Sequence, residues 1–437
     1  MAFQVSPGVN VSEVDLTAGV QTVSLSAGAF VGPFQWGPAF EVTNIASEAD
    51  LVNTFGKPDT DTFKYWFSAA AFLAYSNQLK VVRAVTGDAL NASDSGGGVL
   101  VKNQTDYEVT FPTGANTYGF AIAKYPGDLG NSLKVSVCPS ATAFGSWDYA
   151  NQFAAAPGTS DWADARGGAA DEMHVVVVDE DGAFTGVANT VLERYAFLSK
   201  ANDAKNNAGD PNYYANVLNR KSAYIYWMSA QGSNTDHWGE ASTNTFGADA
   251  TPYTASLSDG LTDNSTIAGG DIAPIETGWD LFADPDSQDV SLLITGPSVV
   301  NGADATLANY VIDNIAEVRK DCVAFVSPSS NSVVNNAGSE VTDVLADRNA
   351  LTSTSYAVMD SGWKYVYDKY NDVYRWVPLN GDIAGLAART DTTNDPWFSP
   401  AGFNRGVVKN VVKLSWNPKQ LDRDNLYSKG VNPVVSF

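Results

Sequence analysis

Cysteine and histidine are scarce in this chain, with two residues of each among 437. Cys138 and Cys322 lie far apart and neither belongs to a C-x-x-C pair, so the sequence predicts neither a zinc site nor a disulfide framework. His174 opens the apolar run HVVVV and His237 lies in a polar loop, which disfavours a Ser-His-Asp or Cys-His catalytic arrangement. We therefore expect reduced core cysteines, no catalytic residue and no enzymatic activity.

Basic residues and long apolar runs are also lacking. Lys and Arg number 26 against 49 Asp and Glu, a net charge of −23, whereas a nucleic-acid partner needs a basic face. The longest apolar runs, such as residues 175–178, fall far short of the ~18 residues of a membrane-spanning helix, and the N-terminus lacks the pattern of an export signal. The sequence thus predicts no nucleic-acid partner and no membrane insertion.

Motifs that bind phosphates or metals are missing as well. The chain has no G-x-x-x-x-G-K-[ST], no G-x-G-x-x-G after a strand and no H-E-x-x-H. Two acidic clusters, at residues 179–182 and 284–289, offer oxygens to calcium, but neither has the glycine and the final glutamate of an EF-hand loop. Hydrogen bonding within turns explains both clusters more simply, so no cofactor and no metal are expected.

The chain does have bulky apolar surface and an uneven distribution of charge. Hydrophobic residues make up 44% and aromatic residues 11%, enough for a folded chain, and the length favours two or three domains. Residues 1–120 carry a net charge of −6, residues 121–360 of −20 and residues 361–437 of +3. Either these segments face different surroundings in an assembly, or the acidic middle is an ordinary solvated surface.

An extended arm is predicted over residues 1–17. Val9 and Val11 alternate with polar residues, and Val14 and Leu16 resume the alternation in the opposite phase, which predicts a strand with a bulge. The Pro-Gly pair before the strand favours a turn and leaves the strand edge free to pair with another sheet. The residues expected in this contact are Ser6, Pro7, Gly8, Val9, Val11, Val14 and Leu16.

Three further segments are predicted behind the arm. Residues 18–87 and 119–260 are expected to form a β-rich mixed domain, and residues 88–118, which begin with the linker-like DALNASDSGGG, a small β insertion. Residues 261–437 alternate strands and helices, the pattern of an α/β domain. The clearest elements are helices near residues 47–55, 63–74, 307–318 and 417–429, strands at 79–85, 133–137, 174–178, 290–295 and 322–326, and an aromatic hairpin at 363–378.

Several separated stretches of the chain carry a resemblance. They are SPGVNVSEVDL at residues 6–16, FQWGPAF at 34–40, EADLVNTFG at 48–56, LKVVRAV at 79–85, YPGDLG at 125–130, WDLFAD at 279–284, YDKYNDVYRWVP at 367–378, DIAGL at 382–386 and SPAGFNRG at 399–406. In this order they resemble the tail sheath proteins of T-even-like contractile bacteriophages, the myovirus tail sheath family. Any one stretch is weak alone, but their shared order over nearly the whole chain makes a chance match implausible.

The resemblance implies a non-enzymatic structural subunit of the virion. Such subunits polymerise as stacked six-fold helical rings around a tail tube, after synthesis in the host cytoplasm, and contract to drive the tube through the host envelope. The implied partners are further copies of the chain, the tail tube protein, and the baseplate and tail terminator proteins. The family's α/β domain is similar in fold to subtilisin-like domains, although no protease triad is carried over.

Two departures from the family pattern qualify these expectations. Family members carry a large protruding domain where this chain has only residues 88–118, so we expect that domain to be reduced. They also continue past the position that matches Phe437 into a C-terminal domain facing the tube, which we expect to be absent from these residues.

Two interpretations stay open for each predicted contact. The arm either adds as a strand to the sheet of a neighbouring subunit or folds back on its own domain. The basic residues either contact an acidic neighbour, the tube or the next subunit, or form ordinary solvated surface; they are Lys409, Lys413, Lys419, Arg423 and Lys429. The competing classes of protein are a subtilisin-like hydrolase and an acidic calcium-binding surface module.

Overall fold

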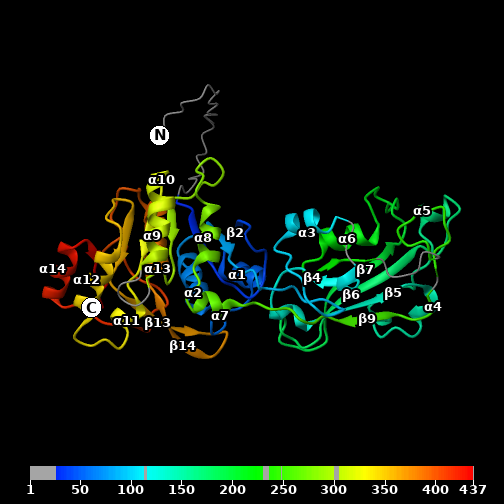
Figure 1. The fold of residues 1–437 in the computed structure, drawn as a ribbon, viewed down its shortest axis with the longest axis horizontal. Coiled ribbons are helices and arrows are strands. Elements are labelled where there is room, and N and C mark those ends of the chain that lie inside the picture. Colours follow the sequence, from blue (N-terminus) through cyan, green and yellow to red (C-terminus); the bar gives the residue numbers. More distant parts are fainter. Residues whose placement is uncertain (1–25, 113–115, 230–235, 248, 300–304, 437) are drawn as a thin grey trace, which may run out of the picture.

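The computed structural model describes residues 26–436 except 113–115, 230–235, 248 and 300–304. The predicted N-terminal arm lies outside these residues, so its strand stays a prediction. The described chain forms two lobes side by side along the longest axis (Figure 1). One lobe contains a seven-stranded sheet and the other a four-stranded sheet, so the chain is a mixed α/β protein with several sheets.

The larger lobe is built on the seven-stranded sheet, in the order β16-β12-β11-β10-β1-β3-β2. All neighbours are parallel except β2, which runs antiparallel to β3. The inner strand β1, GAFVG, is buried at every residue, as expected for a parallel sheet with both faces covered. The strands are β1 (Gly28–Gly32), β2 (Thr43–Ile45), β3 (Leu79–Arg83), β10 (Leu292–Ile294), β11 (Val323–Val326), β12 (Ala357–Asp360) and β16 (Val431–Asn432).

Helices cover both faces of this sheet. The connection from β1 to β3 and that from β10 to β11 run in opposite directions along the sheet, and right-handed crossovers then place their helices on opposite faces. One face carries α2 (Phe63–Leu73) and α13 (Asn380–Thr393), which pack on each other. The other carries α8 (Ala273–Asp280) and a continuous helix formed by α9 (Thr306–Tyr310), the π-helical η5 (Val311–Ala316) and α10 (Glu317–Arg319).

The remaining elements of this lobe surround the sheet. The helices are α1 (Glu48–Phe55), α7 (Asn264–Ala268), α11 (Ser330–Val333), α12 (Glu340–Ala350) and α14 (Gln420–Ser428). The predicted aromatic hairpin is confirmed as β13 (Trp363–Asp368) and β14 (Val373–Pro378), in register from Trp363 with Pro378 to Asp368 with Val373. A short third strand, β15 (Lys413–Leu414), pairs with β13.

The second lobe contains an antiparallel sheet in the order β7-β6-β5-β9. Its strands are β5 (Leu133–Cys138), β6 (Glu172–Asp179), β7 (Thr190–Ser199) and β9 (Tyr253–Ser256), and a separate pair joins β4 (Ala121–Ala123) to β8 (Ile225–Trp227). Short helices flank the sheets: α3 (Gln104–Thr110), η1 (Asn116–Tyr118), η2 (Asp128–Ser132), α4 (Ala141–Phe144), η3 (Ala150–Gln152), α5 (Asp161–Asp164) and α6 (Tyr214–Lys221).

The structure groups the segments differently from the domain boundaries predicted above. Residues 18–87 were expected to join 119–260, but β1 pairs with β10, so residues 28–83 belong to the α/β lobe. The whole stretch between β3 and α7 forms the second lobe, inserted into the first. The cause is that a buried parallel strand has no local signal for its partner, which here lies more than 200 residues away.

The expectation of a small β insertion at residues 88–118 is also corrected. Its described residues make only isolated bridges, such as Asn91 with Val99, and a helix, α3, occupies Gln104–Thr110. The side chain of Asn103 accepts a hydrogen bond from the backbone N–H of Asp106 and so caps this helix. The stretch VLVKNQTDYEVTF at residues 99–111 also has apolar residues at intervals that suggest a strand, which concealed this capping signal.

Candidate functional site

The usual ligand position of an α/β sheet, at the carboxyl ends of its strands, is filled by the chain itself. The buried start of α13 lies there: Asn380 donates through its backbone N–H to the Ser327 hydroxyl at 2.9 Å and through its side chain to the Gly296 carbonyl at 2.7 Å. A Cβ on Gly381 would lie 2.1 Å from the carbonyl oxygen of Ser68 in α2. Protein atoms thus replace a ligand at this edge.

Two buried carboxylates at the same edge are held by neighbouring groups. Asp360 accepts hydrogen bonds from the Ser327 hydroxyl at 2.6 Å and from the Gly362 N–H at 2.9 Å, and burial raises its pKa to about 7. The ammonium of Lys364 lies 2.8 Å from both carboxylate oxygens of Asp382. These contacts anchor β12, β13 and α13 to one another.

Both histidines contact neighbouring groups of the chain that account for their positions. The Phe197 N–H donates to Nδ1 of His174 at 3.0 Å, so Nε2 carries the proton and donates to the Ala155 carbonyl at 2.9 Å. The ring stacks on Phe153 with centroids 4.4 Å apart, and burial lowers its pKa. His237 is at the surface, 2.8 Å from Glu240.

The carboxylates of the two acidic clusters accept hydrogen bonds from backbone groups of their own loops. Asp179 accepts from the backbone N–H groups of Phe184 and Thr185, and Asp284 from that of Asp286. Among the described residues, no group of three or more His, Cys, Asp or Glu is arranged to hold a metal ion, and no helix is long and apolar enough to cross a membrane. Both cysteines are free and buried, as predicted.

The two lobes are joined through the side chain of Arg83, which is completely buried at the end of β3. Its guanidinium donates to the carbonyl oxygens of Phe34 and Gly37 in the α/β lobe, at 3.0 and 2.8 Å. It also donates to the carbonyl of Pro126 in the second lobe at 2.7 Å. Burial lowers the pKa of this side chain, and the carbonyl dipoles offset its desolvation. We therefore describe Arg83 as the interlobe bridge.

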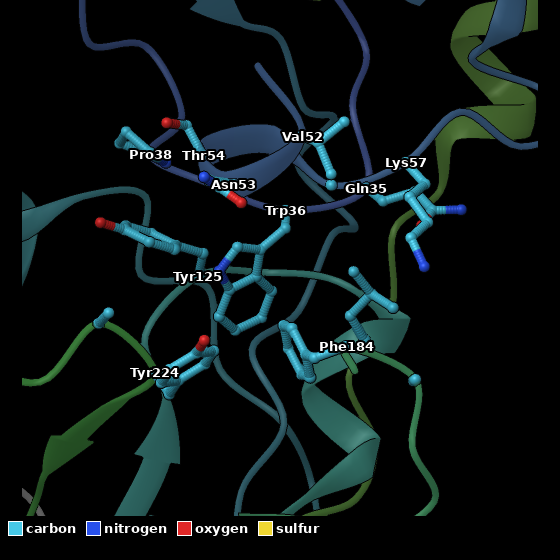
Figure 2. A pocket seen from close by; sticks show the side chains of 14 residues that line it. Gln35, Trp36, Pro38, Val52, Asn53, Thr54, Lys57, Tyr125, Phe184 and Tyr224 are labelled. Atoms are coloured by element: carbon cyan, nitrogen blue, oxygen red, sulfur yellow. The ribbon is translucent and has the colours of Figure 1, made fainter. Parts of the chain in front are cut away.

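A cavity of about 230 Å³ lies beside this bridge. Figure 2 shows Trp36 at its centre, with Tyr125, Phe184 and Tyr224 of the second lobe around it. The Trp36 ring meets those of Tyr125 and Phe184 edge to face, with centroids 5.4 and 5.1 Å apart. Aromatic packing thus adds to the interlobe contact.

The structure separates the five predicted basic residues into two groups. The backbone and side chain of Lys409 bind Tyr75 and the Ala74 carbonyl, and the ammonium of Lys413 in β15 lies over Tyr365 and Trp376. Lys419 precedes α14, Arg423 lies within it and Lys429 follows it. The structure therefore does not bring all five into a single cluster.

The prediction from sequence missed exposed apolar residues that precede and flank the first two of these cations. Trp397 is 79% exposed and Phe403 is 75% exposed, and exposed aliphatic side chains follow at residues 407–412. Exposed aromatic groups of this kind mark interaction surfaces. The signal was present, because the WFSPAGF stretch has apolar residues without helical or strand periodicity.

These observations define the class of protein. The chain itself fills the usual ligand position of the sheet, and both histidines are held by neighbouring groups. Arg83 joins the two lobes, and apolar side chains are exposed at the surface. These features are typical of a structural subunit that binds other proteins.

Comparisons with known proteins identify the family. Residues 289–437 match the model of the phage tail sheath protein central domain, and residues 29–84 that of the tail sheath protein Gp18 domain III N-terminal region. The tail sheath protein of Salmonella phage ViI is 30% identical over 513 residues, covering 100% of this chain and 78% of that protein. That of Enterobacteria phage T4 is 29% identical over 548 residues, covering 98% and 79%.

A solved structure shows the same fold. The sheath tail protein Lin1278 from Listeria innocua superposes with a TM-score of 0.50 at 10% identity, covering 94% of this chain and 66% of that one. This chain belongs to the tail sheath proteins of contractile phages, a family of structural virion components and not of enzymes.

Proposed function

We propose that the chain is the repeating subunit of a contractile tail sheath, which polymerises as stacked six-fold helical rings around a tail tube. Contraction of this sheath would drive the tube through the host envelope. The observation that carries the proposal is the 30% identity to a tail sheath protein over the full length of this chain. A head-to-tail contact that does not close into a ring of fixed size produces a helical polymer, so one pair of complementary surfaces is sufficient.

The proposed partners are further copies of the chain, the tail tube protein, and the baseplate and tail terminator proteins. Subunits would be made and assembled in the host cytoplasm. The mainly parallel sheet, covered on both faces, supports the resemblance to a subtilisin-like domain that we propose for the α/β lobe.

Strand addition is the proposed role of the N-terminal arm, residues Ser6 to Leu16. Within the described residues, β2 and β16 form the two edges of the large sheet, and β14 forms an edge of the hairpin sheet. A strand edge with unpaired backbone groups accepts an extended peptide through main-chain hydrogen bonds. Arms donated to such edges would link subunits while the globular parts move.

The basic group around α14 is proposed to contact an acidic neighbour, either the tube or the next subunit. Within the described residues, the side chains of Arg423 and Lys429 make no hydrogen bond or ion pair. Reversing the charges of Lys419, Arg423 and Lys429 should then weaken assembly. Unaltered assembly would favour an ordinary solvated surface.

Assembly on tail tubes tests the proposed function directly. The purified chain is mixed with tail tubes attached to baseplates and viewed by negative-stain electron microscopy. We expect striated sheaths around the tubes, and deletion of residues 1–16 should abolish them. Bare tubes with the intact chain at every protein and salt concentration would contradict the proposed function; normal sheaths from the deleted chain would contradict only the role of the arm.

A further inference from the structure

Residues 395–413, which we call the docking segment, expose an unusual amount of apolar surface. Its exposed apolar side chains are Trp397, Phe398, Phe403, Val407, Val411 and Val412. A folded chain leaves such a concentration of large apolar groups in water only where another surface covers it. We therefore expect another protein surface to cover the docking segment.

Buried polar groups hold the docking segment in place. The backbone N–H of Lys409 donates to the Tyr75 hydroxyl at 2.6 Å, and that hydroxyl donates to Asp382 at 3.1 Å. The ammonium of Lys364 lies against Asp382 and also donates to the Lys409 carbonyl at 3.2 Å. The carbonyl of Lys409 is thus bound directly to the buried ion pair of Lys364 and Asp382, and its N–H is linked to that pair through the Tyr75 hydroxyl. A segment fixed in this way loses little conformational entropy when it binds.

The charge of the docking segment indicates the chemistry of its occupant. Arg405 and Lys413 lie among the apolar side chains, with Arg405 over the ring of Phe398. Asp395 is the one acidic residue between 395 and 413. An apolar surface with a basic margin fits an apolar surface with an acidic margin.

The chain itself offers such a surface on the other face of the sheet. Helix α8 and the helix from α9 to α10 carry Val318, 65% exposed, and Leu281 among carboxylates. The carboxylates of this acidic face belong to Asp271, Glu276, Asp280, Asp284, Asp313 and Glu317, whereas that of Asp321 is paired with Arg319 at 2.9 Å. Burial raises the pKa of Glu276, and the neighbouring carboxylates of Asp280 and Asp271 raise it further.

The positions of the two surfaces favour contact between copies. Lys409 binds the end of α2, on one face of the sheet, whereas α8 and α10 cover the other. Within one subunit the sheet and its helices separate the two surfaces, so they can pair only between subunits. Pairing of two different surfaces is head-to-tail and continues indefinitely.

We propose that the docking segment of one subunit binds the acidic face of a second copy of this chain. This inference rests on the proposed function, because it assigns the surfaces of one contact in the sheath. Salt would weaken the attraction between the charges at the margin of this contact and would not weaken the packing of the apolar side chains at its centre.

Charge reversal on each side, followed by their combination, tests the contact. The first variant carries Arg405→Glu and Lys413→Glu, the second Asp280→Lys and Asp313→Lys. Each alone should lower the yield of sheath on tail tubes at least tenfold, because repulsive charge pairs then replace attractive ones at the changed positions. Mixing the two variants should restore both contacts of each subunit where the variants alternate, and a chain carrying all four changes should also restore the yield.

Two controls separate the contact from effects on folding and net charge. Arg220→Glu with Lys221→Glu, on α6 of the second lobe, changes the net charge as the first variant does and should leave the yield unchanged. Thermal melting should match the wild type in every variant. Trp397→Ser with Phe403→Ser tests the apolar centre and should also lower the yield.

The outcomes distinguish this inference from the proposed function. Sheaths formed at normal yield by either charge-reversed pair, or a fourfold variant that is not restored, would overturn the inference while the sheath function stands. A wild-type chain that never forms sheaths on tubes would remove the proposed function and this inference with it.

Discussion

The guanidinium of Arg83 donates a 2.7 Å hydrogen bond to the carbonyl of Pro126, across the boundary between the two lobes. The same side chain binds the carbonyls of Phe34 and Gly37 on its own lobe. One buried cation thus fixes the direction in which the second lobe leaves the first. This bridge therefore makes the contact between the lobes more rigid.

Replacing Arg83 by leucine should destabilise the chain. The substitution removes hydrogen bonds from a charged donor and leaves several buried carbonyls unpaired, which we expect to cost about 2–4 kcal/mol in the free energy of unfolding. Urea unfolding measures this loss, and calorimetry should show the two lobes melting further apart in temperature. The exposed Arg220→Leu is the control. An unchanged urea midpoint for Arg83→Leu would show that the bridge is not needed.

The contact between α13 and α2 depends on glycine. Alanine at position 381 would place its Cβ 2.1 Å from the Ser68 carbonyl oxygen, and at 385 it would lie 2.5 Å from the Tyr75 ring. Ala normally stabilises a helix relative to Gly by about 1 kcal/mol. Here the overlap with a neighbouring backbone reverses the sign, and Gly381→Ala should cost about 1–3 kcal/mol.

Gly145→Ala is the matched control for that substitution. Its backbone is helical, with φ of −66°, and nothing lies within 4 Å of the added Cβ. We expect its urea midpoint to equal or exceed that of the wild type. If Gly381→Ala also unfolded at the wild-type urea midpoint, α13 could shift without loss of stability. The close contact of α13 with α2 would then not be needed to close this edge of the sheet.

Local patterns predicted much of this fold. The helices α1 and α2 and the aromatic hairpin were foreseen, because each is set by residues close together in the chain. The pairing of β1 with β10 was not, since every residue of β1 is buried and apolar and so carries no mark of its partner. The interlobe bridge was likewise hidden, because Arg83 ends a strand and its acceptors are backbone carbonyls that have no sequence signature.

The candidate surface was predicted in part. The cations of residues 409–429 were identified from charge alone, but charge does not show that Lys409 and Lys413 are bound by neighbouring rings and carbonyls. Exposure is a property of the folded chain. The sequence therefore showed apolar residues without periodicity in the docking segment, but not that they are exposed.

Asp360 should make stability depend on pH in the mildly acidic range. Burial raises its pKa from 3.8 to about 7, so between these values the folded chain retains a proton that the unfolded chain has lost. The contribution of this group is fully present below pH 3.8 and is lost as the pH rises through 7. Each unit of pKa difference corresponds to about 1.4 kcal/mol.

Asp360→Asn measures this contribution, because asparagine keeps the shape and cannot ionise. The urea midpoint of the wild type minus that of the variant should fall as the pH rises from 5 to 8. The other titratable groups are common to both chains, so their contributions cancel in this difference. The Ser327 hydroxyl can still donate to the amide oxygen, so the variant should fold. A difference between the two chains that stays constant over this range would show that Asp360 ionises in the folded protein as it does in water, and that the sealed edge of the sheet admits solvent.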